Sequence, residues 1–119
     1  AATAETEVSA LFDAYERALV ANDVAAMDAV FWDDPRVVRY GIAEIQEGAE
    51  AVRTWRRSAT PVPTDRTLTS RHVLALSPDV VCVDVTFVNG TAPGTGRQSQ
   101  VWRRFPEGWR IVRAHVSMI

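Results

Sequence analysis

The sequence contains no lysine, and all 13 of its positively charged side chains are arginines. Without lysine the protein has no side-chain amine for Schiff-base chemistry, whereas arginine suits bidentate recognition of carboxylates. A GC-rich coding sequence would produce the same composition, so this absence does not by itself identify a site. The 15 acidic residues outnumber the arginines and give a net charge of -2. No basic excess exists to neutralise phosphates, which argues against nucleic acid as the main partner.

Cysteine, histidine and glycine are also scarce. The one cysteine, Cys82, cannot form an intrachain disulfide, and its place in an apolar run predicts a small buried hydrophobic side chain. His72 and His115 are far apart and have no other histidine or cysteine at ligand spacing, so we expect no metal site and no cofactor. The glycines between Gly90 and Gly96 are too sparse for a phosphate-binding loop and predict an ordinary loop.

No apolar run approaches the roughly 20 residues of a membrane span, so we expect no membrane association. The sequence begins at Ala1 without the basic and apolar regions of a secretory signal, and a cytoplasmic location is therefore expected. With 119 residues, of which 47% are hydrophobic and 24% charged, the chain has the composition of an ordinary soluble protein. Its length suits one hydrophobic core, which predicts a single domain over 1–119.

Three helices are predicted in the first half of the chain. Apolar residues at helical spacing predict the first from about Thr6 to Ala21. Asp23 can cap a shorter second helix, which Asp33-Asp34-Pro35 ends. The third is predicted from about Gly48 to Ala59, where Pro61-Val62-Pro63 forbids helix and begins a linking loop.

The second half of the chain is strand-like. Runs rich in β-branched and aromatic residues predict four strands, at Thr67 to Leu76, Val80 to Asn89, Arg97 to Phe105 and Trp109 to Ser117. Two short strands are predicted earlier, at Arg36 to Tyr40 and around Glu44 to Gln46. Helices followed by an antiparallel meander predict an α+β fold in which the helices cover one face of the sheet. A ligand pocket is expected where the helices and the sheet separate.

Three side chains in the first half of the chain have two interpretations each. Arg39 shares a strand face with Val37, and it is either an edge residue with its charge in water or a cation held in a pocket to receive an anionic small molecule. Tyr15, in the apolar stripe of the first helix, is either a core tyrosine or a pocket residue. Trp32 either lines the pocket or packs in the core. The residue pattern alone leaves these alternatives open.

Polar side chains also mark the last two strands. Gln98 and Gln100 share a face, and such amides either orient a ligand or satisfy one another. In the last strand, alternation places His115 and Ser117 on the same face as Ile111. The other face of that strand is apolar. Which of these faces meets the pocket stays open. A His-x-Ser pair without an oxyanion hole or a nucleophile elbow does not by itself make a serine hydrolase.

Several segments resemble a known family. They include Tyr15 to Leu19, Phe31-Trp32-x-Asp34-Pro35, Arg39-Tyr40-Gly41, Gly96-Arg97-Gln98-Ser99-Gln100, Phe105-Pro106-Glu107-Gly108-Trp109 and Ala114-His115-Val116-Ser117. The chain is similar to the AtzH-like and HpxZ-like group of the SnoaL-like superfamily, which is also called nuclear-transport-factor-like or ketosteroid-isomerase-like. The resemblance covers both ends of the chain and leaves the stretch from about Thr60 to Pro93 unmatched.

The resemblance implies a cone-shaped, mostly antiparallel sheet covered by three helices, with a pocket between the layers. It implies a homodimer or higher homo-oligomer that associates through the sheet. The group includes a decarboxylating amidohydrolase of nitrogen catabolism that converts urea-1,3-dicarboxylate to allophanate without a metal, and residues considered important there match Tyr15 and Arg39. These two are therefore expected to be catalytic toward a small anionic substrate. The expected substrate-binding residues are Trp32, Gln98, Gln100, His115 and Ser117.

Two other functions are compatible with the same sequence. The domain could be a non-catalytic module that binds small carboxylates in a ureide or oxalurate degradation pathway, which predicts saturable binding without product. A proton shuttle like that of ketosteroid isomerase would instead need a carboxylate in an apolar pocket. Asp84 is the one acidic residue inside an apolar strand run, and its position does not follow that family's pattern.

Overall fold

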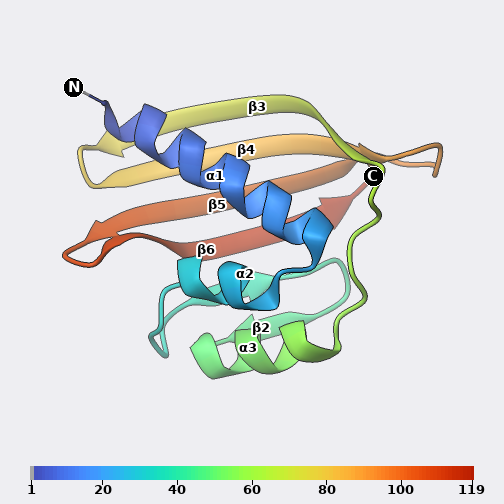
Figure 1. The fold of residues 1–119 in the computed structure, drawn as a ribbon, viewed down its shortest axis with the longest axis horizontal. Coiled ribbons are helices and arrows are strands. Elements are labelled where there is room, and N and C mark those ends of the chain that lie inside the picture. Colours follow the sequence, from blue (N-terminus) through green and yellow to red (C-terminus); the bar gives the residue numbers. More distant parts are fainter. Residues whose placement is uncertain (1) are drawn as a thin grey trace.

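The computed structural model describes residues 2–119 and contains the three predicted helices (Figure 1). They are α1 (Ala4–Ala21), α2 (Val24–Val30) and α3 (Ala49–Ser58). The side chain of Thr3 accepts a hydrogen bond from the Thr6 amide at the start of α1, and Asp23 caps α2 in the same way through the Ala26 amide. These side chains satisfy amides that have no partner within the helix, which fixes where each helix begins.

Six strands form one sheet in the order β2-β1-β6-β5-β4-β3. The strands are β1 (Val38–Tyr40), β2 (Ile45–Glu47), β3 (Arg66–Ser77), β4 (Val80–Asn89), β5 (Gly96–Phe105) and β6 (Gly108–Met118). β1 runs parallel to β6, and all other neighbours are antiparallel. Figure 1 shows α1 lying diagonally across the long strands and α2 and α3 beside the short ones. The predicted α+β class, with three helices on a curved, mostly antiparallel sheet, is confirmed.

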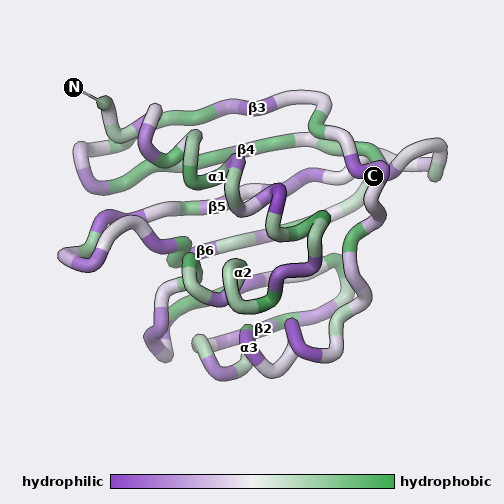
Figure 2. Tube along the Cα trace, in the orientation of Figure 1, coloured by the Kyte–Doolittle hydropathy of each residue, from purple (hydrophilic) through white to green (hydrophobic). Residues whose placement is uncertain are grey.

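The core lies between α1 and the face of the sheet that α1 covers, here called the inner face. Val8 and Phe12 of α1 are fully buried, as are Val81 of β4 and Trp102 of β5. Figure 2 shows hydrophobic colouring along much of β4, because both faces of this strand carry many apolar residues. Because side chains alternate along a strand, Val81 and every second residue of β4 after it point to the inner face.

A β-bulge in β6 corrects one prediction about its faces. Trp102 pairs with Ile111 but Val101 pairs with Arg113, so Val112 is an extra residue on β6. An extra residue shifts the alternation by one. Ile111 is therefore fully buried on the inner face, whereas His115 is exposed on the other face. The prediction that these two residues share a face was wrong.

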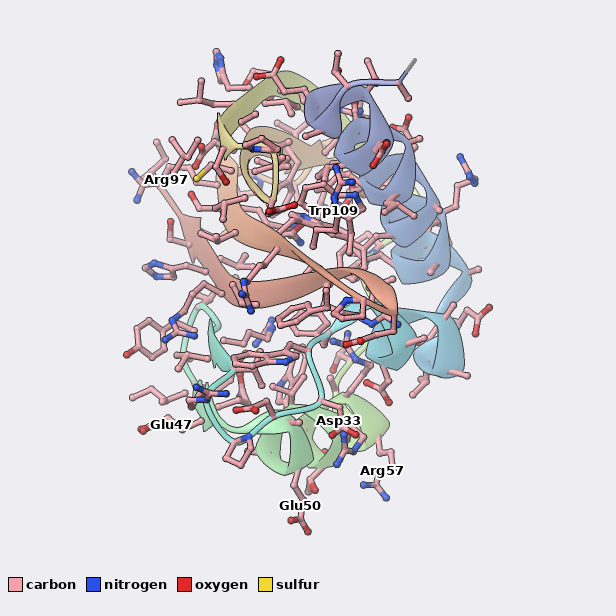
Figure 3. All side chains as sticks on the ribbon, turned by 90° about the vertical axis from the view of Figure 1, so that its left-hand side faces the viewer. Asp33, Glu47, Glu50, Arg57, Arg97 and Trp109 are labelled. Atoms are coloured by element: carbon pink, nitrogen blue, oxygen red, sulfur yellow. The ribbon has the colours of Figure 1, made fainter. Side chains whose placement is uncertain are left out.

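The opposite face of the sheet, here called the outer face, is not covered by any helix among residues 2–119. Figure 3 shows Arg97 projecting away from the side on which α1 lies, whereas Trp109 lies toward α1. Cys82 is half-buried and pairs with Val101 on this face, between the buried residues Val81 and Val83. The expectation of a buried Cys82 is corrected, although partial burial does raise the pKa of its thiol.

The expected homo-oligomer that associates through the sheet stays a prediction. Within the part of the chain that the structure describes, no helix has the length and apolar character needed to cross a membrane.

Candidate functional site

A cavity of about 320 Å³ lies between the helices and the inner face of the sheet. This volume is near the lower end of the range for small-molecule sites, which is about 300 to 1,000 Å³. The linker from Thr60 to Pro63 closes one side of it. Apolar side chains form much of the wall, among them Leu19, Trp55, Phe87, Val116 and Met118. The polar wall includes Tyr15, Arg39, Arg56, Arg66, Gln98 and Gln100.

Arg39 projects from β1 into this cavity, and its side chain is only 11% exposed. Its guanidinium carbon lies 3.6 Å from the centre of the Trp55 ring, so α3 supports it by a cation–π contact. The Nη1 atom donates to Gln46 Oε1 at 2.9 Å and to Glu44 Oε1 at 3.2 Å. The Nε and Nη2 atoms have no hydrogen-bond partner among residues 2–119, so one edge of the guanidinium is available.

Burial leaves Arg39 a poorly solvated cation. Burial lowers the pKa of its guanidinium below the usual range, and the hydrogen bond with Glu44 only opposes this shift. Arginine nevertheless keeps its proton in proteins. A desolvated guanidinium with a free edge is a suitable receptor for a carboxylate, which it can bind through two parallel hydrogen bonds. The alternative of an edge residue with its charge in water does not fit this geometry.

Glu44 is the one acidic side chain lining the cavity within the described residues 2–119. It lies in the turn between β1 and β2, and its side chain is 37% exposed. A Cβ atom at position 41 would overlap the Glu44 carboxylate, so the missing side chain of Gly41 lets Glu44 fold back onto Arg39. Glu44 therefore contacts Nη1, beside the free edge of Arg39, and offsets part of the charge that would attract a ligand carboxylate.

Tyr15 lies on the inner stripe of α1 and is 6% exposed. Its ring packs against Phe31, with 6.1 Å between ring centres. The hydroxyl has no hydrogen-bond partner within 2–119, although the residue lines the cavity. Tyr15 is also close enough to Arg39 to influence its pKa, after burial and the hydrogen bond with Glu44. The two residues expected to be catalytic thus lie together at one end of the cavity, here called the Arg39 end.

Both predicted amides of β5 also line the cavity, with orientations fixed by their neighbours. Gln100 Oε1 accepts from the indole of Trp102 at 2.8 Å, and Gln98 Oε1 accepts from Arg66 Nη2 at 3.3 Å. Indole and guanidinium groups only donate, so each amide must use its oxygen there and leave its NH₂ for other partners. Neither amide nitrogen has a hydrogen-bond partner among the residues described.

Two further arginines line the cavity and were missed by sequence reasoning. Arg56 of α3 donates to Asp28 at 2.7 Å, and Arg66 of β3 donates to Glu16 at 3.0 Å; both arginine side chains are 4% exposed. Arg56 follows Val52 by four residues and so continues the apolar stripe of α3, a signal that could have revealed its burial. Arg66 precedes the predicted start of its strand and looked like part of the linker.

Three predicted binding residues lie outside this cavity. Trp32 stacks on Phe105 over a separate surface hollow, with 5.3 Å between ring centres. The chain leaves α2 in an extended conformation at Phe31, so Phe31 points into the core and Trp32 points away. The structure does not bring Trp32 to the cavity.

His115 and Ser117 lie on the outer face of β6 for a similar reason. Ala114, Val116 and Met118 line the cavity, so the alternate residues point to the other side. His115 packs edge-on against Tyr40, and Ser117 accepts from Arg97 Nε at 3.0 Å. The apolar face of β6, rather than its His-x-Ser face, meets the cavity.

The cavity therefore combines an apolar wall with several hydrogen-bond donors. The side chains of Tyr15, Arg39 and Gln100 have unused N–H or O–H groups within the described chain, and Gln46 and Glu44 accept only from Nη1 of Arg39. Such a wall suits a small ligand rich in carboxylate and carbonyl oxygens. Asp84 is exposed and accepts from Ser99 at 2.6 Å, so it supplies no carboxylate to the cavity. Residues 2–119 contain no group of three or more His, Cys, Asp or Glu side chains arranged to hold a metal ion.

Comparison with solved structures identifies near relatives. A cystatin-like fold protein from Burkholderia xenovorans LB400 is 48% identical, with a TM-score of 0.94, covering 98% of this chain and 92% of the other. A protein of unknown function from the DUF3225 family of Pectobacterium atrosepticum is 39% identical, with a TM-score of 0.93 and coverage of 98% and 91%. A nuclear transport factor 2-like superfamily protein from Salmonella enterica, at 20% identity, shares the fold, with a TM-score of 0.79 and coverage of 97% and 90%.

No curated protein matches the chain. A model of the AtzH-like family matches residues 2–119, including the stretch from 60 to 93 in which the sequence showed no shared segment. The match thus extends over both the helices and the whole sheet that surround the cavity. The chain belongs to the AtzH-like family.

Proposed function

We propose that the protein is a metal-independent amidohydrolase or decarboxylase of small carboxylated ureas, of which urea-1,3-dicarboxylate, converted to allophanate, is one example. The observation that carries this proposal is the free edge of Arg39 beside the unpartnered hydroxyl of Tyr15 in one small cavity. A carboxylated urea has the carboxylate and carbonyl oxygens that such donors bind.

The two residues at the Arg39 end and the amide of Gln100 each have a role in this reaction. Arg39 binds a carboxylate through Nε and Nη2, and the amide nitrogen of Gln100 donates to a carbonyl oxygen. In a decarboxylation, the bond between a urea nitrogen and a carboxyl carbon breaks, carbon dioxide leaves, and the electron pair stays on the nitrogen. Tyr15 supplies the proton that this nitrogen takes up, and water returns a proton to the tyrosine.

A screen of small carboxylated ureas with the purified protein tests the proposal. Mass spectrometry should detect both a retained ligand and a new product that has lost carbon dioxide or an amine. Retention without any product would favour the alternative, a non-catalytic carboxylate-binding or accessory module of ureide degradation. Neither retention nor product with any member of the panel would contradict both functions.

The role of Glu44 gives a separate prediction. Glu44→Gln removes the negative charge that partly offsets Arg39, and we expect the affinity for a small monocarboxylate such as N-acetylglycine to rise about three- to five-fold. The effect is modest because a partly exposed ion pair is weak. Isothermal titration calorimetry measures it, and Glu47→Gln, at an exposed position of β2, is the matched control. Weaker binding by Glu44→Gln would show that Glu44 contacts the ligand instead of only offsetting the charge of Arg39.

A further inference from the structure

The cavity has a second polar end, formed by Arg66, Asn89 and Gln98 and here called the amide end. Arg66 pairs with Asn89 across β3 and β4, and it donates to Gln98 on β5. Arg39 pairs with Ala114, which pairs with Gln100, two residues from Gln98 along β5. Strand spacings then place the backbones of Arg39 and Gln98 about 12 Å apart. Side chains from both positions reach into the same cavity.

The charge of Arg66 is already neutralised within the protein. Its Nε and Nη2 atoms donate to the two carboxylate oxygens of Glu16, at 3.0 and 3.2 Å. The side chains of Arg66 and Glu16 are 4% and 14% exposed, and the guanidinium carbon lies 3.8 Å from the centre of the Phe87 ring. A Cβ atom on Gly96 would overlap that ring, so Gly96 makes room for this support. A bidentate, buried pair of this kind does not release its cation to a ligand.

Two buried polar atoms at the amide end have no partner. Gln98 is 5% exposed, and its Nε2 atom is buried without a hydrogen bond in the described chain. The Oδ1 atom of Asn89 is likewise buried without a hydrogen bond in the described chain. Buried polar groups are normally paired, and each unpaired one calls for a cause. Here the unpaired atoms are one donor and one acceptor, the complement of the C=O and N–H groups of an amide.

We propose that the amide end binds the uncharged carboxamide or ureido terminus of a ligand whose carboxylate lies on Arg39. The ligand's C=O accepts from Gln98 Nε2, and its N–H donates to Asn89 Oδ1. Arg66 is the one cation at the amide end within the described residues, and both oxygens of Glu16 hold it, so this end offers no free charge to a second carboxylate. The inference narrows the class proposed above to carboxylated ureas with one uncharged end, and it disfavours a dicarboxylate such as urea-1,3-dicarboxylate as the preferred member. This inference rests on the proposed binding of a carboxylate at Arg39.

Three stable probes with the same carboxylate test the inference by calorimetry on the purified protein. N-carbamoylglycine carries a terminal ureido group, 4-methylpentanoate has the same heavy-atom skeleton without the amide oxygen and nitrogens, and 1,3-bis(carboxymethyl)urea carries a second carboxylate. We expect N-carbamoylglycine to bind at least about ten-fold more tightly than either of the others. Gln98→Met should remove most of the advantage over 4-methylpentanoate and change the Kd of 4-methylpentanoate less than about two-fold. Ser99→Ala, at the next residue on the outer face, is the matched control and should change no Kd.

The outcomes separate this inference from the proposed function. Equal binding of the three probes, or tightest binding of the dicarboxylate, would overturn the neutral amide end and leave carboxylate binding at Arg39 intact. Binding of none of the probes would overturn both. If Gln98→Met does not fold, as judged by circular dichroism, the ranking of the three probes by the unmodified protein still decides the question.

Discussion

Replacing Arg39 by lysine is expected to weaken binding of a small carboxylate about ten-fold and to lower turnover of the carboxylated urea by at least as much. Lysine keeps the charge but cannot form the two parallel hydrogen bonds of a guanidinium. Arg39→Met should cost about 100-fold or more in affinity, because it removes a desolvated cation from the site. Calorimetry with N-acetylglycine measures the binding, and product formation measures the turnover.

A suitable control for Arg39 lies on the other face of the sheet. Arg97→Lys changes the same residue type on β5, where the side chain projects away from the helices (Figure 3). It should leave affinity and turnover unchanged. Arg39→Met also removes the donor to the buried Gln46 amide, so the melting temperature of each variant must be measured beside its affinity. Parent affinity and turnover in a folded Arg39→Lys protein would show that Arg39 does not hold the carboxylate.

Removing only the hydroxyl of Tyr15 should have the largest effect on turnover. Tyr15→Phe keeps the ring that packs on Phe31, so the fold and the Kd for a carboxylate should change little. If the hydroxyl delivers the proton to the leaving nitrogen, turnover should fall about 100- to 10,000-fold. Single-turnover measurements with saturating substrate separate this loss from a change in binding.

The second tyrosine provides the matched control. Tyr40 is 45% exposed on the outer face and contacts His115 rather than the cavity. Tyr40→Phe should therefore turn over substrate at the parent rate. If Tyr15→Phe also did so, the hydroxyl would have no part in proton transfer, and the tyrosine would only form the wall of the cavity.

Much of the fold is predictable because its signals are local. Asp23 and the prolines Pro61 and Pro63 mark helix boundaries through the chemistry of single residues, whereas α2 ends at Val30, before the predicted stop at Asp33-Asp34-Pro35. Strand alternation placed Gln98 and Gln100 on one face, and the structure puts both in the cavity. These inferences need no knowledge of which other elements lie nearby.

The parts that sequence reasoning missed depend on contacts between distant elements. The bulge at Val112 arises from the pairing of β6 with β5, and alternation within β6 alone assigns Ile111 to the wrong face. The burial of Arg66 depends on Glu16, 50 residues earlier in the chain, which neutralises it. A charged residue is expected to be exposed until its partner is known. Arg66 was therefore invisible as a pocket residue, whereas Arg39 was found through the family resemblance.

The Arg39–Glu44 pair keeps the cation of the empty cavity balanced. Glu44 contacts Nη1, so a ligand carboxylate can bind the free Nε and Nη2 edge without displacing it. The guanidinium always has an anionic neighbour in a poorly solvated place, and the empty protein needs no strained or collapsed form of the site. Part of the charge of Arg39 is therefore offset before a ligand arrives. Affinity must come from the paired hydrogen bonds of a carboxylate rather than from charge alone, which disfavours simple inorganic anions such as chloride.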